Sequence, residues 1–131
     1  MIARIAAAIA GIGIVAAVGI GAAQTATRFD GIYDLRSTSL VPGAVALNPR
    51  RPCSLELHAE PLHIVGSHAT MTFHRTTTAA GDVSPQGVFL LMDLGARLEF
   101  TGKIDIHGEL RGYLNTFDGC GYDLILRKRP Q

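Results

Sequence analysis

The stretch RLEFTGKIDIHGELRGYLNTFDGCGYDLILRK, residues 97–128, decides the fold class, because apolar and polar residues alternate along most of it. Alternation with a period of two places every second side chain on one face of a β-strand. The joints between the runs carry Gly102, Gly108 and Gly119, as short hairpin turns often do. The pattern predicts a meander of hairpins whose inward side chains are Leu98, Phe100, Ile104, Ile106, Leu110, Leu114, Cys120, Tyr122, Leu124 and Leu126.

Shorter alternating runs fill the middle of the chain. Their expected inward residues are Leu55 and Leu57 in CSLELHAE, Leu62 and Ile64 in PLHIV, and Met71 and Phe73 in HATMTFHRT. The run GVFLLM, residues 87–92, is apolar on both faces, which predicts either a central strand covered on both sides or part of an interface. Two longer loops, Ser37 to Pro52 and Thr77 to Gly87, are expected between the runs. Loops on a rigid scaffold often carry binding residues, so both are candidates for a contact surface.

A nearly repeated phrase marks the two ends of the presumed mature chain: FDGIYDL at residues 29–35 and FDGCGYDL at residues 117–124. In each copy an Asp-Gly turn signal precedes an alternating run, so we interpret the repeat as scaffold. With GIYDLR at residues 31–36, the runs amount to about seven or eight strands, typical of an all-β antiparallel barrel or sandwich. Pairing the first strand with the last would leave no open sheet edge.

The N-terminal stretch MIARIAAAIAGIGIVAAVGIGAAQTA has one cation, Arg4, followed by an apolar run and small residues. This layout predicts a signal peptide over residues 1–23 with cleavage after Ala23. A retained membrane anchor is the alternative, and it would be the chain's one link to a membrane. Residues 24–131 then form a single domain in the periplasm or outside the cell.

The leader predicts export, and the two cysteines that follow it, Cys53 and Cys120, therefore predict one disulfide. Loss of Arg4 with the leader would balance the 12 basic residues of the chain against its 11 acidic ones. Phosphate binding relies on an excess of Lys and Arg, so a nucleic-acid partner is not expected.

Three groups of residues are candidates for chemistry. Asp30, Asp34, Asp118 and Asp123 would form a cation site if the end strands brought them together, and His58, His63, His68, His74 and His107 are numerous enough for a metal or pH-sensing patch. Ser67 and His68 are adjacent, and neighbouring side chains point apart, which disfavours a catalytic pair. No catalytic residue, metal ligand or cofactor is therefore assigned.

Several features together resemble a group of small, exported, functionally uncharacterised bacterial β-proteins. They are the leader, FDGIYDL, a first Cys in a strand, the spaced glycines from Gly102 to Gly112, and the CGYDLILRK run. This resemblance implies an exported β-domain and carries over no active-site residue. The chain also resembles periplasmic inhibitors of secreted metalloproteases, which are single-disulfide β-barrels ending in a strand with Leu and Arg.

We therefore expect a non-enzymatic exported domain that binds a protein or an envelope component. An inhibitor of a secreted protease is the first alternative, and a small hydrolase or a metal-binding protein is the second.

Overall fold

The computed structural model describes residues 27–41, 53–54, 56–116 and 118–131 of the chain, and the predicted leader lies outside these ranges. Its eight strands are β1 (Gly31–Leu40), β2 (Leu62–Val65), β3 (His68–Phe73), β4 (Thr77–Asp82), β5 (Val88–Asp93), β6 (Leu98–Ile104), β7 (Glu109–Asn115) and β8 (Gly121–Lys128). Within the described ranges, no helix is both long enough and apolar enough to cross a membrane.

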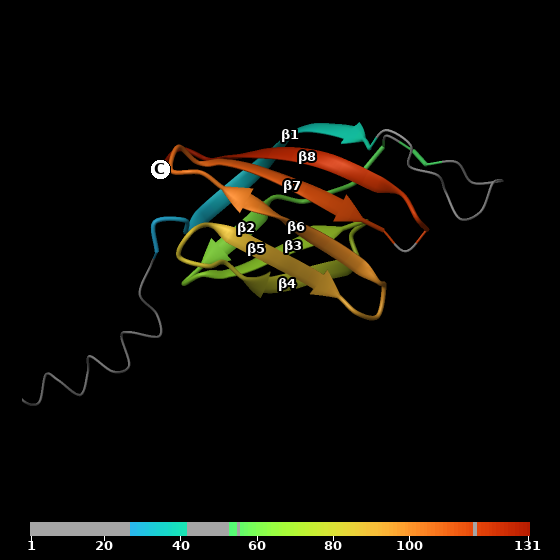
Figure 1. Ribbon diagram of the computed structural model, residues 1–131, viewed down its shortest axis with the longest axis horizontal. Helices are drawn as coiled ribbons and strands as arrows, with labels where there is room; N and C mark the ends of the chain where they lie inside the picture. The colour runs from blue at the N-terminus through green and yellow to red at the C-terminus, as the bar shows by residue number, and fades with distance from the viewer. Residues whose placement is uncertain (1–26, 42–52, 55, 117) are drawn as a thin grey trace, which may run out of the picture.

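The strands form a closed antiparallel barrel in which each strand pairs with its neighbours in sequence (Figure 1). β1 and β8 close the barrel through a register that runs from Tyr33 opposite Lys128 to Leu40 opposite Tyr122. Closure leaves no unpaired sheet edge between β1 and β8. The all-β prediction and the pairing of the first strand with the last are confirmed, and the architecture is a barrel rather than a sandwich.

Apolar side chains from all eight strands fill the inside of the barrel. Phe100 lies at the centre of an aromatic group, with its ring edge-to-face to Phe73 at 6.3 Å and to Phe89 at 5.2 Å between centroids. Full burial of a large apolar side chain stabilises a fold by about 1.5–3 kcal/mol. Of the inward residues expected from alternation, those confirmed are Leu62, Ile64, Met71, Phe73, Leu98, Phe100, Ile104, Leu110, Leu114, Cys120, Tyr122, Leu124 and Leu126.

One residue expected in the core, Ile106, is 75% exposed. The strand ends at Ile104, and the Asp105 carboxylate accepts hydrogen bonds from the backbone N–H groups of His107 (2.8 Å) and Glu109 (3.0 Å). An Asp that binds the backbone two residues ahead favours a turn over further strand. Ile106 therefore lies in the β6–β7 turn, and its prediction as a core residue is wrong.

The expected loop from Thr77 to Gly87 is also wrong, because Thr77–Asp82 is strand β4. Its sequence, TTAAGD, has little side-chain bulk and therefore gave little strand signal. Pairing with β3 stabilises this segment as a strand, with Phe73 opposite Thr77 at one end and His68 opposite Asp82 at the other.

The expected loop from Ser37 to Pro52 begins too early, since β1 continues to Leu40. A β-bulge at Arg36 explains the error: Leu35 lies opposite Leu126, while Ser37 lies opposite the next residue, Ile125. The extra residue reverses the inward and outward positions of β1, which breaks the alternation that a strand prediction requires. Residues 42–52 lie outside the described part of the chain.

Residues 53–60 were expected as a strand, and the described ones, 53–54 and 56–60, lie outside the barrel ladder. A single bridge joins Ala59 to Phe73, and Leu57 packs half-buried against the core. Leu55 is not among the described residues. A segment that contacts the barrel at only a few points can show the same alternation of buried and exposed residues as a paired strand. The sequence pattern therefore does not distinguish such a segment from a strand.

Strand β5 contains the doubly apolar run. Phe89 and Leu91 face the core, whereas Val88 and Leu90 face outward with 51% and 48% of their surface exposed. The prediction of a strand covered on both sides is therefore not met within this chain, and the interface interpretation of the run remains a prediction.

Candidate functional site

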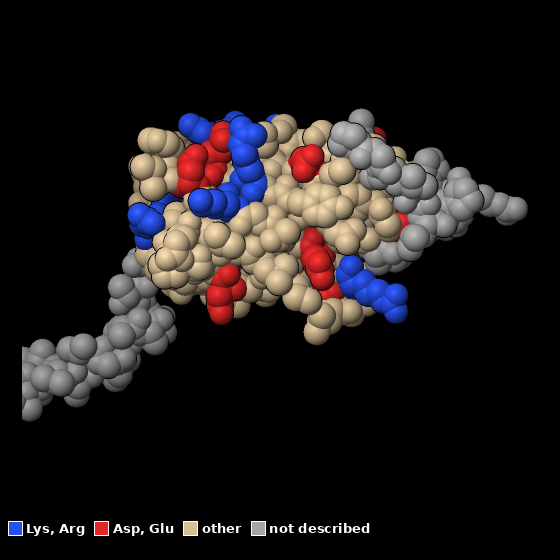
Figure 2. Space-filling model, in the orientation of Figure 1, with Lys and Arg blue, Asp and Glu red and all other residues tan. Residues whose placement is uncertain are grey.

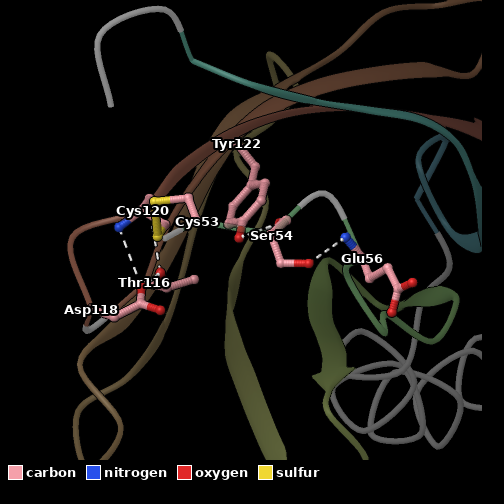
Figure 3. The surroundings of a disulfide bond; sticks show 7 residues. All are labelled: Cys53, Ser54, Glu56, Thr116, Asp118, Cys120 and Tyr122. Atoms are coloured by element: carbon pink, nitrogen blue, oxygen red, sulfur yellow. Dashed lines mark hydrogen bonds between the residues drawn. A yellow bond between two sulfur atoms is a disulfide. The ribbon is translucent and has the colours of Figure 1, made fainter. Parts of the chain in front are cut away.

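The predicted disulfide is present: Cys53 and Cys120 are bonded, and Cys120 is completely buried (Figure 3). The Tyr122 hydroxyl donates a hydrogen bond of 2.8 Å to the carbonyl of Ser54, next to Cys53. Burial raises the pKa of Tyr122, and the charge of Asp118 adds to that effect. The disulfide and this hydrogen bond together hold the segment after residue 52 against the start of β8.

The two copies of the repeated phrase lie at opposite ends of the β1–β8 pair (Figure 1). Asp30 precedes β1 and accepts hydrogen bonds from Gly66 N (2.7 Å), Ser67 N (3.3 Å) and the Thr27 hydroxyl (2.6 Å). It thus holds the tight β2–β3 turn. Asp118 accepts from Cys120 N and from the Thr116 hydroxyl within the β7–β8 turn. Each Asp organises a turn, which supports the scaffold interpretation.

The other two aspartates are also apart. Asp34 lies opposite Arg127 and forms a two-point ion pair with Arg129, whose Nη2 is 2.7 Å from the carboxylate. Asp123 lies four residues before Arg127 on β8, which is roughly 13 Å along a strand. The hydrogen bonds of Arg129 lower the pKa of Asp34. The hypothesis of a four-aspartate cation site is therefore wrong.

The contacts of Asp30 predict a pH-dependent contribution to stability. Burial opposes ionisation, but the hydrogen bonds from Thr27, Gly66 and Ser67 outweigh it and lower the pKa of Asp30 below its usual 3.8. A lowered folded-state pKa adds stability above pH 3.8 that is lost as the pH falls through the folded value. We expect Asp30→Asn to destabilise the protein by about 1 kcal/mol at pH 7, which is below the usual range for a charge-assisted bond because solvent screens this carboxylate, and by less at pH 3.

Urea unfolding of both proteins at pH 7 and pH 3 would measure this difference. Asp82→Asn is the matched control, since its carboxylate is 88% exposed and meets a single partner, His68. An equal effect of Asp30→Asn at both pH values would contradict the proposed role of the carboxylate charge.

The five histidines are all exposed and do not converge. His58 and His74 are neighbours, with ring centroids 6.2 Å apart, and His68 Nδ1 lies 3.3 Å from Asp82. Across the described ranges, no three His, Cys, Asp or Glu side chains are grouped as metal ligands. No hydrogen bond joins the hydroxyl of Ser67, a described residue, to the imidazole of His68, so nothing in this region brings a nucleophile and base together.

A hollow lies on the outer surface of the described barrel. It lies over β6, β7, β8 and β1 and has a volume of about 550 Å³. Two glycines, Gly102 and Gly112, are opposite each other in its floor and occupy inward-facing positions of β6 and β7. A Cβ on Gly102 would lie 2.2 Å from the Arg111 carbonyl oxygen, and one on Gly112 would lie 2.4 Å from the Phe100 ring.

Neither glycine has a side chain, and the Phe100 ring lies directly beneath Gly112. The bulge at Arg36 bends β1 at the opposite side of the hollow. Gly102 was expected to be a joint between two strands; it lies within β6, so that expectation is wrong. The hollow results from these local departures from a regular barrel surface.

The walls of the hollow come from two rows of outward side chains. Thr101, Tyr113, Asp123 and Ser39 are opposite one another across four strands, and Arg111, Ile125 and Ser37 form the next row. Four strands span about 14 Å, and the rows are about 7 Å apart. The lining therefore combines an aromatic ring, a cation, a carboxylate, hydroxyl groups and an apolar patch.

Sequence reasoning missed this site. A signal for it exists: a hairpin centred on the His107-Gly108 turn pairs residue 102 with residue 112, and both are glycines at inward positions. The cross-strand wall residues could not be listed from sequence, because the bulge at Arg36 shifts the register of β1.

No protein-family model matches this chain, and no curated protein and no solved structure matches it either.

Proposed function

We propose that this chain is an exported domain without catalytic chemistry that binds a protein or envelope component through the outer face of β5–β8. The single observation that carries the proposal is where the apolar residues lie. The barrel interior is filled with core side chains, so a partner has to contact the outside. On that outside, Val88 and Leu90 on β5 and Tyr113 on β7 present apolar surface next to the hollow, with Thr101 of β6 between Leu90 and Tyr113.

The surface over β5, β6 and β7 combines uncharged and charged areas. Figure 2 shows uncharged surface with acidic residues within it, and basic and acidic residues gathered side by side toward one end. Surfaces that bind proteins are depleted of charge at their centres and enriched in aromatic residues. Clustered exposed apolar residues are a common mark of a contact surface.

Export is supported by the disulfide, because such bonds persist in oxidising compartments and are rare in the cytosol. The leader predicted over residues 1–23 adds to this argument. Among residues 27–41, 53–54, 56–116 and 118–131, basic and acidic side chains are mixed and several are paired, as Asp34 is with Arg129, which disfavours a nucleic-acid partner.

A pull-down from envelope and culture-supernatant extract tests the proposal, with the oxidised chain from Gln24 onward as bait. We expect Leu90→Lys to lower recovery of the partner at least tenfold, because a charge would be buried at the centre of the contact. Val65→Lys is the matched control, since Val65 is 71% exposed on β2 and lies outside this face.

Equal recovery with both variants would contradict the assignment of the surface, and an empty pull-down with the unmodified bait would contradict the envelope partner. A protease as the retained protein would favour the inhibitor alternative. Both variants should first show the melting temperature of the parent, so that lost binding reports on the surface alone.

A further inference from the structure

The hollow on the barrel surface has the size of a small-ligand site. Its volume of about 550 Å³ lies within the range of small-ligand sites, roughly 300–1,000 Å³. Extended peptides often bind by adding a strand to a free sheet edge. The four strands under the hollow, β6, β7, β8 and β1, pair with one another, so a ligand here has to be recognised by side chains rather than by main-chain pairing.

Tyr113 forms an aromatic platform at the rim of this hollow. The phenol end of its ring lies against Gly121, where a Cβ would be 2.4 Å from the hydroxyl oxygen and 2.9 Å from the ring carbon Cε1. The ring is thus held across the surface of β8, and the side chain remains 39% exposed. The face of an aromatic ring carries negative charge density and attracts C–H groups, whose hydrogen atoms carry a partial positive charge.

Polar groups surround the platform with complementary hydrogen-bonding capacity. Asp123 lies directly opposite Tyr113, and its carboxylate accepts no hydrogen bond from the part of the chain that the structure describes. Arg111 Nε donates to Glu109 at 2.9 Å, which orients the guanidinium while its Nη groups remain available as donors. Thr101 donates to the Phe89 carbonyl at 3.1 Å and so presents its hydroxyl oxygen as an acceptor.

This combination matches a neutral ligand that has one apolar face and many hydroxyl groups. A carboxylate accepts from hydroxyl groups and a guanidinium donates to them, in fixed planar geometry. The lining holds one cation and one anion, Arg111 and Asp123, so it provides no net attraction for a polyanion or a polycation.

We propose that the hollow floored by Gly102 and Gly112 binds a neutral oligosaccharide, with one sugar ring stacked on Tyr113 and its hydroxyl groups bonded to Asp123 and Arg111. This inference rests on the proposed binding function and names a ligand class for the outer face. The span of the lining, about 14 Å by 7 Å, accommodates one to two sugar rings.

The test is a titration of the ¹⁵N-labelled oxidised chain with chitotetraose, cellotetraose and maltotetraose, followed by two-dimensional NMR. The amide groups of Gly102 and Gly112 report from the floor of the hollow. We expect at least one sugar to shift both signals at millimolar concentration, and Tyr113→Ala to weaken that binding about tenfold. Tyr113→Phe keeps the ring and should stay within about threefold of the parent.

Asp123→Ala provides a second variant that removes no buried group, in case Tyr113→Ala perturbs β8 packing. Val65→Ala is the control on the other side of the barrel and should leave sugar binding unchanged. The proposal is overturned if none of the sugars shifts the two glycine amides at about 10 mM, or if the shifts persist in both Tyr113→Ala and Asp123→Ala.

Tetra-alanine serves as a peptide probe, and shifts with this peptide but not with the sugars would reassign the hollow to peptides. The pull-down with Leu90→Lys uses no sugar. A specific partner there, together with silent titrations, would refute the oligosaccharide and leave the binding function standing.

Discussion

Removing the disulfide by the double substitution Cys53→Ala and Cys120→Ala should lower the free energy of unfolding by about 4 kcal/mol. The two residues are 67 positions apart, so the bond restricts much of the unfolded chain. On the chain-entropy account, opening such a loop lets the unfolded ensemble expand. A loss of this size is a large part of the roughly 5–15 kcal/mol by which domains are stable.

Paired urea and thermal unfolding would measure this loss, with the parent protein in a reducing agent as the matched control. The melting temperature should fall by roughly 15–25 °C. The urea dependence should steepen, because an uncrosslinked chain exposes more surface when it unfolds. A fall of under about 5 °C would contradict the entropic argument.

Contacts other than the disulfide also hold the segment that carries Cys53 against the barrel. Backbone hydrogen bonds from His74 N to His58 O (2.8 Å) and from Glu60 N to Thr72 O (2.9 Å) also hold the segment that carries Cys53. If they fixed the segment without the disulfide, the bond would constrain a loop that remained ordered locally. The experiment therefore distinguishes a covalent tether from a segment docked by its own contacts.

Alternation predicts strands well where the inward side chains are apolar and the outward ones are polar or charged. Residues such as Leu98 and Leu110 are buried as expected, because their outward neighbours are charged. Prediction failed where one extra residue or a turn-forming side chain intervened. The bulge at Arg36 reversed the phase of β1, and Asp105 ended β6 before the apolar Ile106 could turn inward.

The candidate site was less accessible to sequence reasoning than the fold. Its walls join residues from β1 and from β6–β8, which only the closed register brings opposite each other. Its floor is formed at two glycines, which have no side chain. Scattered glycines in a sequence usually indicate turns, so these two did not point to a site. The disulfide, by contrast, was predictable because the chain offers one possible pair of cysteines.

Phe100→Ala should produce the largest effect of any single core substitution argued here, about 3–5 kcal/mol. The ring is completely buried and contacts both Phe73 and Phe89 edge-to-face, so truncation removes buried area and two aromatic contacts. Chemical unfolding gives the loss directly. Phe100→Leu, which leaves a smaller cavity, provides a folded variant if the alanine protein does not fold.

The same ring explains why position 112 is glycine, and this leads to a prediction of non-additivity. Gly112→Ala places a methyl group 2.4 Å from the Phe100 ring, so it should destabilise the parent but cost at least about 1 kcal/mol less when residue 100 is Ala or Leu. Gly102→Ala is the matched control: its methyl group would meet the Arg111 carbonyl at 2.2 Å, which truncating Phe100 does not move. If truncating Phe100 reduced the cost of both glycine variants equally, the hollow would be shaped by the β6–β7 strand pair alone. If it reduced the cost of Gly112→Ala alone, core packing beneath the floor would set the depth of the hollow.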